Sequence, residues 1–457
     1  MNNKNTTHKT NMESAAHEYI HPTAGCKLNV VIVGAGLGGL GAAIGISLAG
    51  HNVTVLEAAS EIGEIGAGIQ IHPNASRILT RWGLAPALSA YWTTPRCVNM
   101  LSWRGEPLAS MRFAEAAEKY GSPFWDFHRA NLHRCLLERA VELGATVRCK
   151  ARVDTLEFVG GETTVVLEGG ERVTADLVVG ADGIYSKTRE AFVGHKDPPK
   201  KTGDLAYRLL LDAREMLKDP ELAGMVTDPQ VMYWLGPDKH AVSYVLRGGR
   251  QFNMVLLVPD DLPDSSTVVP GNVAEMCALY ADWDARIPKL LGLCTEVHKW
   301  KLSIRPNDLP AWSNPAGTFV LLGDAVHAAL PYLAAGAGMA LEDGAFLGLA
   351  LGSIKSRSEV KRALTVYERG RRARVARIVE RGNVQQYLYH LPDGAEQCER
   401  DRKLRMNPTP PGEVLAWRDP EFAPWLMGYD VEKDFKKYWE MPKDKERRRE
   451  HVTRSLL

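Results

Sequence analysis

The sequence predicts an α/β fold, in which a domain built on a parallel sheet is interrupted by an antiparallel sheet and followed by C-terminal helices. Residues 28–57 have the pattern of a buried strand, a glycine turn, a helix and a second strand. A buried strand running into a glycine turn returns at residues 318–322. Between these, residues 203–300 contain alternating runs such as VMYWLG and HAVSYVLRGG, which are typical of antiparallel strands.

The first of these elements carries a glycine signature. The apolar run at residues 28–33 leads into GAGLGG at residues 34–39, which matches G-x-G-x-x-G. Gly34 permits a tight turn, Gly36 lets the backbone approach a pyrophosphate, and Gly39 lets helix and strand pack closely. The helix that follows offers free N–H groups and a partial positive charge to phosphates.

An acidic residue completes the signature. Glu57 ends the second strand, roughly 20 residues beyond the glycines, where a carboxylate accepts the ribose hydroxyls of an adenosine. A 2′-phosphate would be repelled by this carboxylate. The sequence therefore predicts a dinucleotide site that favours FAD or NAD over NADP.

The bulk composition argues against several other classes of protein. The chain has 457 residues, of which 45% are hydrophobic and 24% charged, as in globular proteins with more than one domain. Lysine and arginine number 56 against 55 aspartate and glutamate, so no global charge favours a nucleic acid or an anionic membrane. The seven cysteines are scattered without a C-x-x-C motif, which predicts no metal site, no disulfide framework and a cytoplasmic protein with reduced thiols.

Three further stretches are interpreted from their composition. Residues 1–26 are polar and lack the apolar core of a secretory signal, so we expect a disordered lead-in. Residues 325–341 are the most apolar later stretch but are too short to span a membrane, and we expect a buried helix there. Residues 360–389 predict a long helix, whose many arginines we interpret as a solvated face with i,i+4 pairs.

Two more motifs follow the glycine signature in a fixed order. Residues 180–189 are GADGIYSKTR, and residues 321–348 are LLGDAVHAALPYLAAGAGMALEDGAFLG. With GAGLGG, this set resembles the single-component, class A flavoprotein monooxygenases, and is most similar to their salicylate-hydroxylase-like fungal branch. The resemblance covers roughly residues 28–430. It implies a Rossmann-like FAD-binding domain interrupted by a β-sheet substrate domain, with C-terminal helices.

The resemblance also implies where the domains begin and end. We expect a discontinuous FAD-binding domain at residues 27–95, 126–202 and 301–356. The substrate domain would comprise residues 96–125 and 203–300, and a C-terminal helical segment would comprise residues 357–457.

The later motifs receive cofactor roles from this resemblance. Asp324 would accept hydrogen bonds from the ribityl hydroxyls of FAD, and the helix starting at Gly336 and Ala337 would aim its N-terminus at the flavin pyrimidine edge. Asp182 and Arg189 would serve both FAD and the passing nicotinamide. Taken singly, Asp324 would be interpreted as a helix cap and Asp182 as a turn residue.

Two positions outside the motifs complete the expected cofactor site. Arg129 at a helix start would contact the cofactor, although without the resemblance it could equally be a surface helix residue. Gly68 lies in the glycine-dense residues 62–71, whose exposed backbone would lie near the isoalloxazine together with Gly66. One departure is Ala335, where many relatives have glutamine, so a side-chain contact near the flavin is lost.

The activity that the resemblance implies is monooxygenation. NADPH or NADH reduces FAD, O₂ is captured as a flavin hydroperoxide, and its distal oxygen attacks an electron-rich carbon of a small aromatic substrate. Hydroxylation of a phenol or benzoate-like acid and epoxidation of an indole or isoprenoid arm of a larger natural product both remain open. A non-catalytic flavin-binding regulator is a further alternative. We expect a role in fungal secondary metabolism or aromatic catabolism, as a monomer or homodimer without a nucleic-acid partner.

Candidate catalytic residues are expected on the interrupting sheet. Arg208 is the first choice, because a guanidinium could bind a phenolate or carboxylate; the alternative is a pair with an acid on the outer face. Its neighbour Tyr207 and the later Tyr244 could hydrogen-bond a substrate, although a tyrosine in a strand also serves packing. Histidines such as His240 and His327 stand isolated in the sequence and predict no catalytic base.

Overall fold

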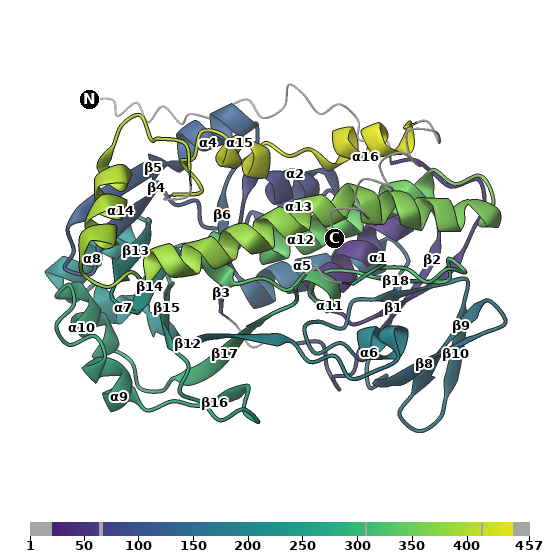
Figure 1. Ribbon diagram of the computed structural model, residues 1–457, viewed down its shortest axis with the longest axis horizontal. Coiled ribbons are helices and arrows are strands. Elements are labelled where there is room, and N and C mark those ends of the chain that lie inside the picture. Colours follow the sequence, from purple (N-terminus) through teal and green to yellow (C-terminus); the bar gives the residue numbers. More distant parts are fainter. Residues whose placement is uncertain (1–20, 64–66, 307–308, 413–414, 442–457) are drawn as a thin grey trace, which may run out of the picture.

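Two large β-sheets form the frame of the molecule, and the long helix α13 (Val360–Tyr389) runs across both of them in Figure 1. The structure is a computed structural model that describes residues 21–63, 67–306, 309–412 and 415–441. Residues 1–20 of the expected lead-in, and Gly66, lie outside this part of the chain. The rest of the lead-in is tied to the fold, because the amides of Ala24 and Gly25 donate to the carbonyls of Ala49 (3.1 Å) and Ile354 (2.8 Å).

The first sheet is parallel throughout, as the apolar strand pattern predicts. Its strand order is β18 (Phe319–Leu321), β11 (Leu177–Gly180), β1 (Asn29–Val33), β2 (Asn52–Leu56) and β7 (Thr146–Arg148). The helices that pack together beside it are α1 (Leu37–Leu48), α5 (Arg129–Glu142) and α12 (Gly336–Gly352). The carboxyl ends of β1, β11 and β18 all lead into the loops that form the cavity described below.

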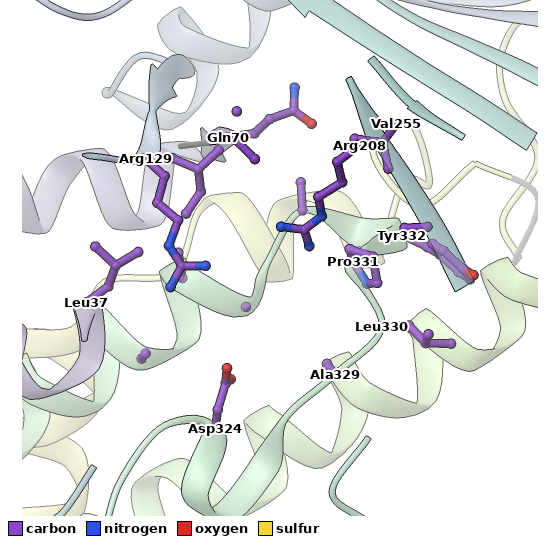
Figure 2. A pocket seen from close by; sticks show the side chains of 18 of the residues that line it. Leu37, Gln70, Arg129, Arg208, Val255, Asp324, Ala329, Leu330, Pro331 and Tyr332 are labelled. Atoms are coloured by element: carbon purple, nitrogen blue, oxygen red, sulfur yellow. The ribbon is translucent and has the colours of Figure 1, made fainter. Parts of the chain in front are cut away.

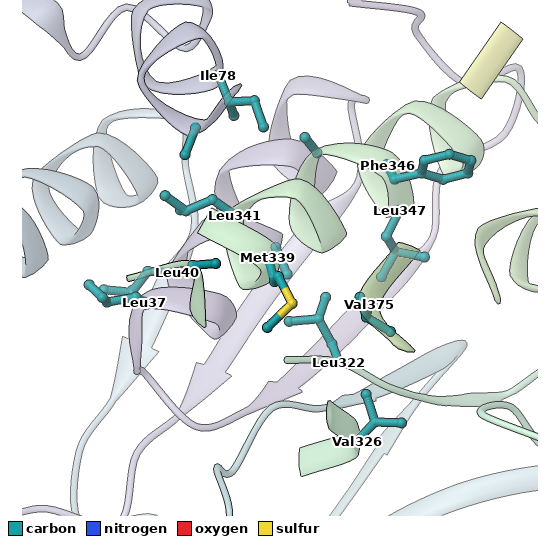
Figure 3. Close-up of a cluster of buried hydrophobic side chains, with 14 of the residues drawn as sticks. Leu37, Leu40, Ile78, Leu322, Val326, Met339, Leu341, Phe346, Leu347 and Val375 are labelled. Carbon is teal, nitrogen blue, oxygen red and sulfur yellow. The ribbon is translucent and has the colours of Figure 1, made fainter. Parts of the chain in front are cut away.

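Helices α1 and α12 cross with their backbones in contact. A Cβ atom at Gly45 would lie 2.5 Å from the carbonyl oxygen of Gly344, and one at Gly348 would lie 2.5 Å from the Gly45 carbonyl carbon. Only glycine permits such an approach. Apolar side chains around the crossing, including Leu40 and Met339, form the buried cluster of Figure 3. The crossing therefore fixes the two helix N-termini relative to each other.

The stretch at residues 325–341 is buried, but the prediction of a single helix there is wrong. A short helix, α11 (Asp324–His327), is followed by a 3₁₀ turn, η1 (Pro331–Leu333), and α12 begins only at Gly336. Pro331 cannot continue a hydrogen-bonded helix, and Ala334 adopts a left-handed conformation with φ 50°. The interruption brings the start of α12 to the cavity.

The interpretation of the α13 arginines as a solvated face holds only in part, because Arg377 is exposed and Arg372 pairs with Glu368 at i,i+4, whereas other arginines of the helix are buried. Arg371 is fully buried and lies 2.8 Å from Glu342 and 2.7 Å from Asp343, both on α12. Arg374 donates to the same Glu342 carboxylate at 2.8 Å. These arginines are therefore partners of buried acids on the neighbouring helix, and the network joins α13 to α12.

The second sheet has eight strands and is antiparallel except where β4 pairs with β13. Its order is β16 (Val268–Pro270), β17 (His298–Ile304), β12 (Lys200–Asp212), β15 (Gln251–Pro259), β14 (Lys239–Leu246), β13 (Val231–Gly236), β4 (Cys97–Ser102) and β5 (Pro107–Arg112). One face carries a core of its own against α9 (Val273–Ala278) and α10 (Arg286–Leu291). The other face looks toward the starts of α1, α5 and α12 and lines the cavity.

Smaller elements complete the frame, and no helix within the described residues is long and apolar enough to cross a membrane. The remaining strands are β3 (Gly68–Ile71), β6 (Trp125–His128), β8 (Val153–Val159), β9 (Glu162–Leu167) and β10 (Arg172–Ala175). The remaining helices are α2 (Pro73–Arg81), α3 (Ala85–Leu88), α4 (Phe113–Tyr120), α6 (Lys187–Val193), α7 (Ala213–Met216), α8 (Pro220–Thr227), η2 (Arg357–Glu359), α14 (Ala395–Arg405), α15 (Phe422–Met427) and α16 (Val431–Trp439).

Candidate functional site

A cavity lies between the two sheets, and residues of all three sequence motifs line it. One wall comes from the turn after β1, the loop after β18 and the start of α12. The opposite wall comes from inward-facing side chains of β12, β13, β14 and β15. In Figure 2 the guanidinium groups of Arg129 and Arg208 extend into the same space, with Asp324 on its opposite side.

The glycine turn has the geometry that its spacing predicts. Gly34 has a φ of 103°, and a Cβ there would lie 2.5 Å from the carbonyl oxygen of Ala181. A Cβ at Gly39 would lie 1.9 Å from the carbonyl oxygen of Gly34. At Gly36, in contrast, a Cβ would meet no atom within 4 Å, and this residue lines the cavity. Two glycines therefore allow close packing, while the third leaves its backbone open to a ligand.

Glu57 stands beside this turn. Its carboxylate accepts hydrogen bonds from the amides of Ala35 and Ala59, both at 2.9 Å. These bonds hold the carboxylate at the end of β2, next to the glycines. His133 on α5 was not anticipated from the sequence, and its Nε2 lies 2.6 Å from the Ala35 carbonyl oxygen, which steadies the same turn.

Asp324 and the start of α12 form the other part of this wall. Asp324 follows Gly323, whose φ of 64° turns the chain sharply, and its exposed carboxylate has no hydrogen-bond partner among the described residues. The amide of Gly323 donates to the buried Asp343 at 3.1 Å, so the α12–α13 charge network anchors this corner. Gly336 and Ala337 line the cavity, with open space beside Gly336.

The second motif contributes backbone to the cavity and uses its charged side chains elsewhere. Asp182 accepts from the amides of Lys187 (2.7 Å) and Thr188 (2.9 Å), so its carboxylate closes its own loop. Its neighbours Ala181 and Gly183 line the cavity instead. Arg189 is buried, pairs with Asp197 and reaches carbonyl groups of α11. The structure thus places both motif side chains behind the wall.

Arg129 and Gly68 lie where the two sheets meet. Arg129 begins α5, its amide donates to the Ala67 carbonyl at 2.9 Å, and its side chain reaches the cavity. The Gly68 amide donates to the Asn253 side chain at 2.8 Å. A Cβ at Gly68 would lie 2.4 Å from the Tyr244 ring, so glycine is required for this contact between β3 and β14.

Tyr207 does not face the cavity. Successive residues of a strand point to opposite faces of a sheet, and Arg208 takes the cavity side of β12. Tyr207 lies in the core on the other face, where its hydroxyl donates to Glu275 at 2.9 Å. The structure therefore removes Tyr207 from the candidate catalytic set.

Arg208 has no acidic partner among the described residues, and its guanidinium lies over the Trp300 ring, 4.9 Å from the centroid. Burial, together with the positive charge of Arg129, lowers the pKa of Arg208. Tyr244 also lines the cavity, and burial raises the pKa of its hydroxyl well above the usual value. A cationic group on a buried wall is a site that favours an anion.

His240 and His327 are not isolated, contrary to the interpretation of the sequence. His327 Nε2 lies 2.6 Å from Asp343 Oδ2, within the charge network of α12. His240 lines the cavity, and its Nδ1 lies 2.7 Å from Nε2 of His390. No local sequence signal could reveal the contact between the two histidines, since His390 is 150 residues from His240.

Comparisons with known proteins agree with this geometry. The family model described as an FAD binding domain matches residues 27–382. The FAD-dependent monooxygenase OpS4 of Beauveria bassiana (strain ARSEF 2860) is 41% identical over 410 residues, which cover 88% of this chain and 95% of the relative. The 3-amino-4-hydroxybenzoate 2-monooxygenase PtmB3 of Streptomyces platensis is 35% identical over 406 residues, covering 88% and 96%.

Solved structures share the fold along nearly the whole chain. FqzB matches with a TM-score of 0.78 and 25% identity, covering 92% of this chain and 95% of FqzB. A salicylate hydroxylase substrate complex matches with a TM-score of 0.74 and 24% identity, covering 90% and 98%. With the matched family model and the relatives above, these findings show that the chain belongs to the FAD-dependent aromatic monooxygenases of class A.

Proposed function

We propose that this enzyme hydroxylates a small, electron-rich aromatic acid, with FAD as cofactor, NADPH or NADH as reductant and O₂ as oxidant. Arg208 carries the proposal, because it is a cavity-facing cation with no acidic partner in the described part of the chain. A buried unpaired charge is unfavourable, and a substrate carboxylate or phenolate supplies the missing partner. The compound named for the relative PtmB3, 3-amino-4-hydroxybenzoate, is an acid of this kind.

The opposite wall fits FAD. The open backbone at Gly36 suits a pyrophosphate, and Glu57 beside it suits the adenosine ribose. The unpartnered carboxylate of Asp324 offers acceptors to ribityl hydroxyls, and the first turn of α12 at Gly336 and Ala337 offers N–H groups to the flavin pyrimidine edge. When bound and reduced by NAD(P)H, FAD supplies the activated oxygen.

The chain's own groups would then bind and orient the substrate. Arg208 would hold the substrate anion and so set which ring carbon faces the cofactor. The apolar side chains of Val242, Val255 and Leu257 extend this wall around the aromatic ring and exclude water. Tyr244, on the same wall, would hydrogen-bond a ring substituent.

The test is oxygen incorporation by the purified, FAD-loaded protein. NADPH and NADH consumption would be followed with phenolic acids, with the matched phenols that lack a carboxylate, and with indoles, under isotope-labelled O₂. Label in a hydroxylated acid, with little turnover of the matched phenol, supports the proposal. Label only in an indole or alkene product would replace it with the epoxidase, and a protein that retains no FAD would contradict it.

A further inference from the structure

Gln70 is a polar side chain of the cavity that the proposed function leaves without a role. It lies on β3, lines the cavity and is 5% exposed. In Figure 2, Gln70 and Arg208 lie on the same side of the cavity, opposite Asp324. The Gln70 side chain is therefore placed toward the part of the cavity that we assign to the substrate.

Asp126 sets the orientation of the Gln70 carboxamide. The two residues are directly paired across β3 and β6, so their side chains share one face of this two-stranded sheet. Nε2 of Gln70 donates to Oδ1 of Asp126 at 3.0 Å. A carboxamide has an acceptor oxygen and a donor nitrogen, and here the nitrogen end is turned toward Asp126. The end that remains for the cavity is the oxygen, Oε1.

This oxygen lacks a donor in the protein. Oε1 of Gln70 has no hydrogen-bond partner among the described residues, although the side chain is buried. A buried amide oxygen without a donor is unfavourable, because it has lost its hydrogen bonds to water. The position therefore favours a ligand that brings an N–H or O–H group to it.

A second acceptor lies close to Gln70. Gly68 and Gln70 point to the same face of β3, because successive residues of a strand alternate. A Cβ at Gly68 would lie 2.5 Å from the hydroxyl oxygen of Tyr244, so this hydroxyl lies against that face. Burial raises the pKa of Tyr244, so the hydroxyl stays neutral and its oxygen accepts hydrogen bonds. Two oxygen acceptors, one from β3 and one from β14, thus lie along one face.

The charges around these acceptors favour a neutral donor. Arg208 and Arg129 both line the cavity, and their positive charges oppose an ammonium group. Burial raises the pKa of Asp126, and its Oδ2 has no hydrogen-bond partner within the described residues, so Asp126 does not supply a compensating negative charge. An aromatic amine is neutral near pH 7 and carries two N–H donors, which match two acceptors better than the single donor of a hydroxyl does.

We propose that Gln70, held by Asp126, is a specificity-determining residue that accepts a hydrogen bond from an amino group on the substrate ring. The substrate class is then an aminobenzoic acid, with its carboxylate at Arg208 and its amino group toward Gln70 and Tyr244. An amino group also gives electron density to the ring, as the proposed function requires. The inference rests on that function, because it specifies the substrate of the same site.

The test is a titration of the FAD-loaded protein with pairs of acids in which a methyl group replaces the amino group. The pairs are 3-amino-4-hydroxybenzoate with 4-hydroxy-3-methylbenzoate, and 4-aminobenzoate with 4-methylbenzoate, and binding is followed by the flavin absorbance. The two groups are similar in size, and burial alone favours the methyl group. In the wild-type protein, the amino member of at least one pair should nevertheless bind more tightly.

Variants assign this preference to single residues. Gln70→Met keeps the length of the side chain and removes the acceptor, so the buried amine loses its partner. The preference for the amino member should then fall about 5- to 100-fold, while FAD content stays unchanged and the methyl member binds no more weakly.

The anchor and the control are tested in the same way. Asp126→Leu leaves the Gln70 amide free to present either end, so the preference should fall by a smaller factor; an unchanged preference would contradict the role of Asp126. Gln397→Met is the matched control and should behave as wild type. The Gln397 amide also donates to an aspartate, Asp401, but on α14 and outside the residues that line the cavity.

Two outcomes overturn the inference. One is a wild-type protein that binds the amino member of neither pair more tightly than the methyl member. The other is a preference for the amino member that stays unchanged in Gln70→Met. The first comparison needs no variant, so it decides even where a substitution impairs folding. Equal binding of both members leaves the proposed function standing, whereas a wild-type protein that binds none of the four acids contradicts the proposed function as well.

Discussion

Replacing Arg208 with methionine should separate ligand binding from stability. The guanidinium faces the cavity, lies 4.9 Å from the centre of the Trp300 ring and has no acidic partner among the described residues. Burial and the nearby Arg129 charge lower its pKa, which shows that its surroundings disfavour the charged form. Methionine keeps much of the apolar stem and removes the charge. We therefore expect weaker binding of acids without a loss of folding stability.

The magnitude follows from the lost charge-assisted hydrogen bond. Such bonds contribute about 1.5–3 kcal/mol, and about 1.4 kcal/mol is tenfold in affinity. The dissociation constant for 4-hydroxybenzoate should therefore rise about 10- to 100-fold, while that for phenol should stay within about threefold. Because an unpaired buried charge is removed, the free energy of unfolding of the FAD-free protein should stay equal or rise by about 1 kcal/mol.

The assay is a titration of the FAD-loaded protein with each ligand, followed by the flavin absorbance, alongside urea unfolding of the FAD-free protein. Arg250→Met removes an exposed arginine near the same sheet and is the matched control, with no change expected in either measurement. Equal losses of affinity for the acid and for phenol would refute the assignment of Arg208 as the anion partner. So would a loss of several kcal/mol in stability.

Three further predictions concern the cofactor wall, the helix crossing and pH. Asp324→Ala should yield largely FAD-free protein, measured as the flavin absorbance per chain after purification; full occupancy would contradict its assignment. Gly348→Ala forces a Cβ to 2.5 Å from Gly45 and should cost about 1–3 kcal/mol in urea unfolding, whereas Gly224→Ala on an exposed helix should gain about 0.5–1 kcal/mol. Burial lowers the pKa of His72 to about 3, so protonation in the unfolded state should reduce stability as the pH falls below about 6.5, by up to about 1.4 kcal/mol per pH unit. His72→Phe should flatten that pH dependence, and an unchanged slope in unfolding titrations would show that another group causes it.

The cofactor wall could be anticipated because its constraints are local. A Cβ at Gly39 would meet the Gly34 carbonyl oxygen, and Gly34 has a φ of 103° that favours glycine, so both requirements lie within six residues of chain and their spacing is visible in the sequence. The roles of the charged side chains behind that wall could not be predicted from the sequence in the same way. The carboxylate of Asp182 accepts hydrogen bonds from amides of its own loop. The sequence motif alone does not distinguish this structural role from ligand binding.

The substrate wall could be anticipated only in part, because it depends on contacts between distant segments. Alternation along β12 allows Tyr207 or Arg208 to face the cavity, but not both, and the choice depends on which face α9 and α10 cover. His240 and His390 are 150 residues apart, so their contact has no local pattern. Composition likewise could not distinguish a solvated arginine from Arg371, whose acidic partners lie on another helix.

The two walls of the cavity differ in how they tolerate sequence change. The cofactor side is built largely from backbone, so it offers few side chains that can be exchanged without disturbing the chain path. The other side is built from the side chains of strands whose hydrogen bonds do not depend on their identity, among them Val242, Val255 and Leu257. A library that randomises these three positions would change the shape of the substrate side of the cavity and leave the residues of the cofactor side unchanged. The fold is therefore suited to directed evolution, because variants of the substrate side could accept new aromatic acids while the FAD side of the cavity stays unchanged.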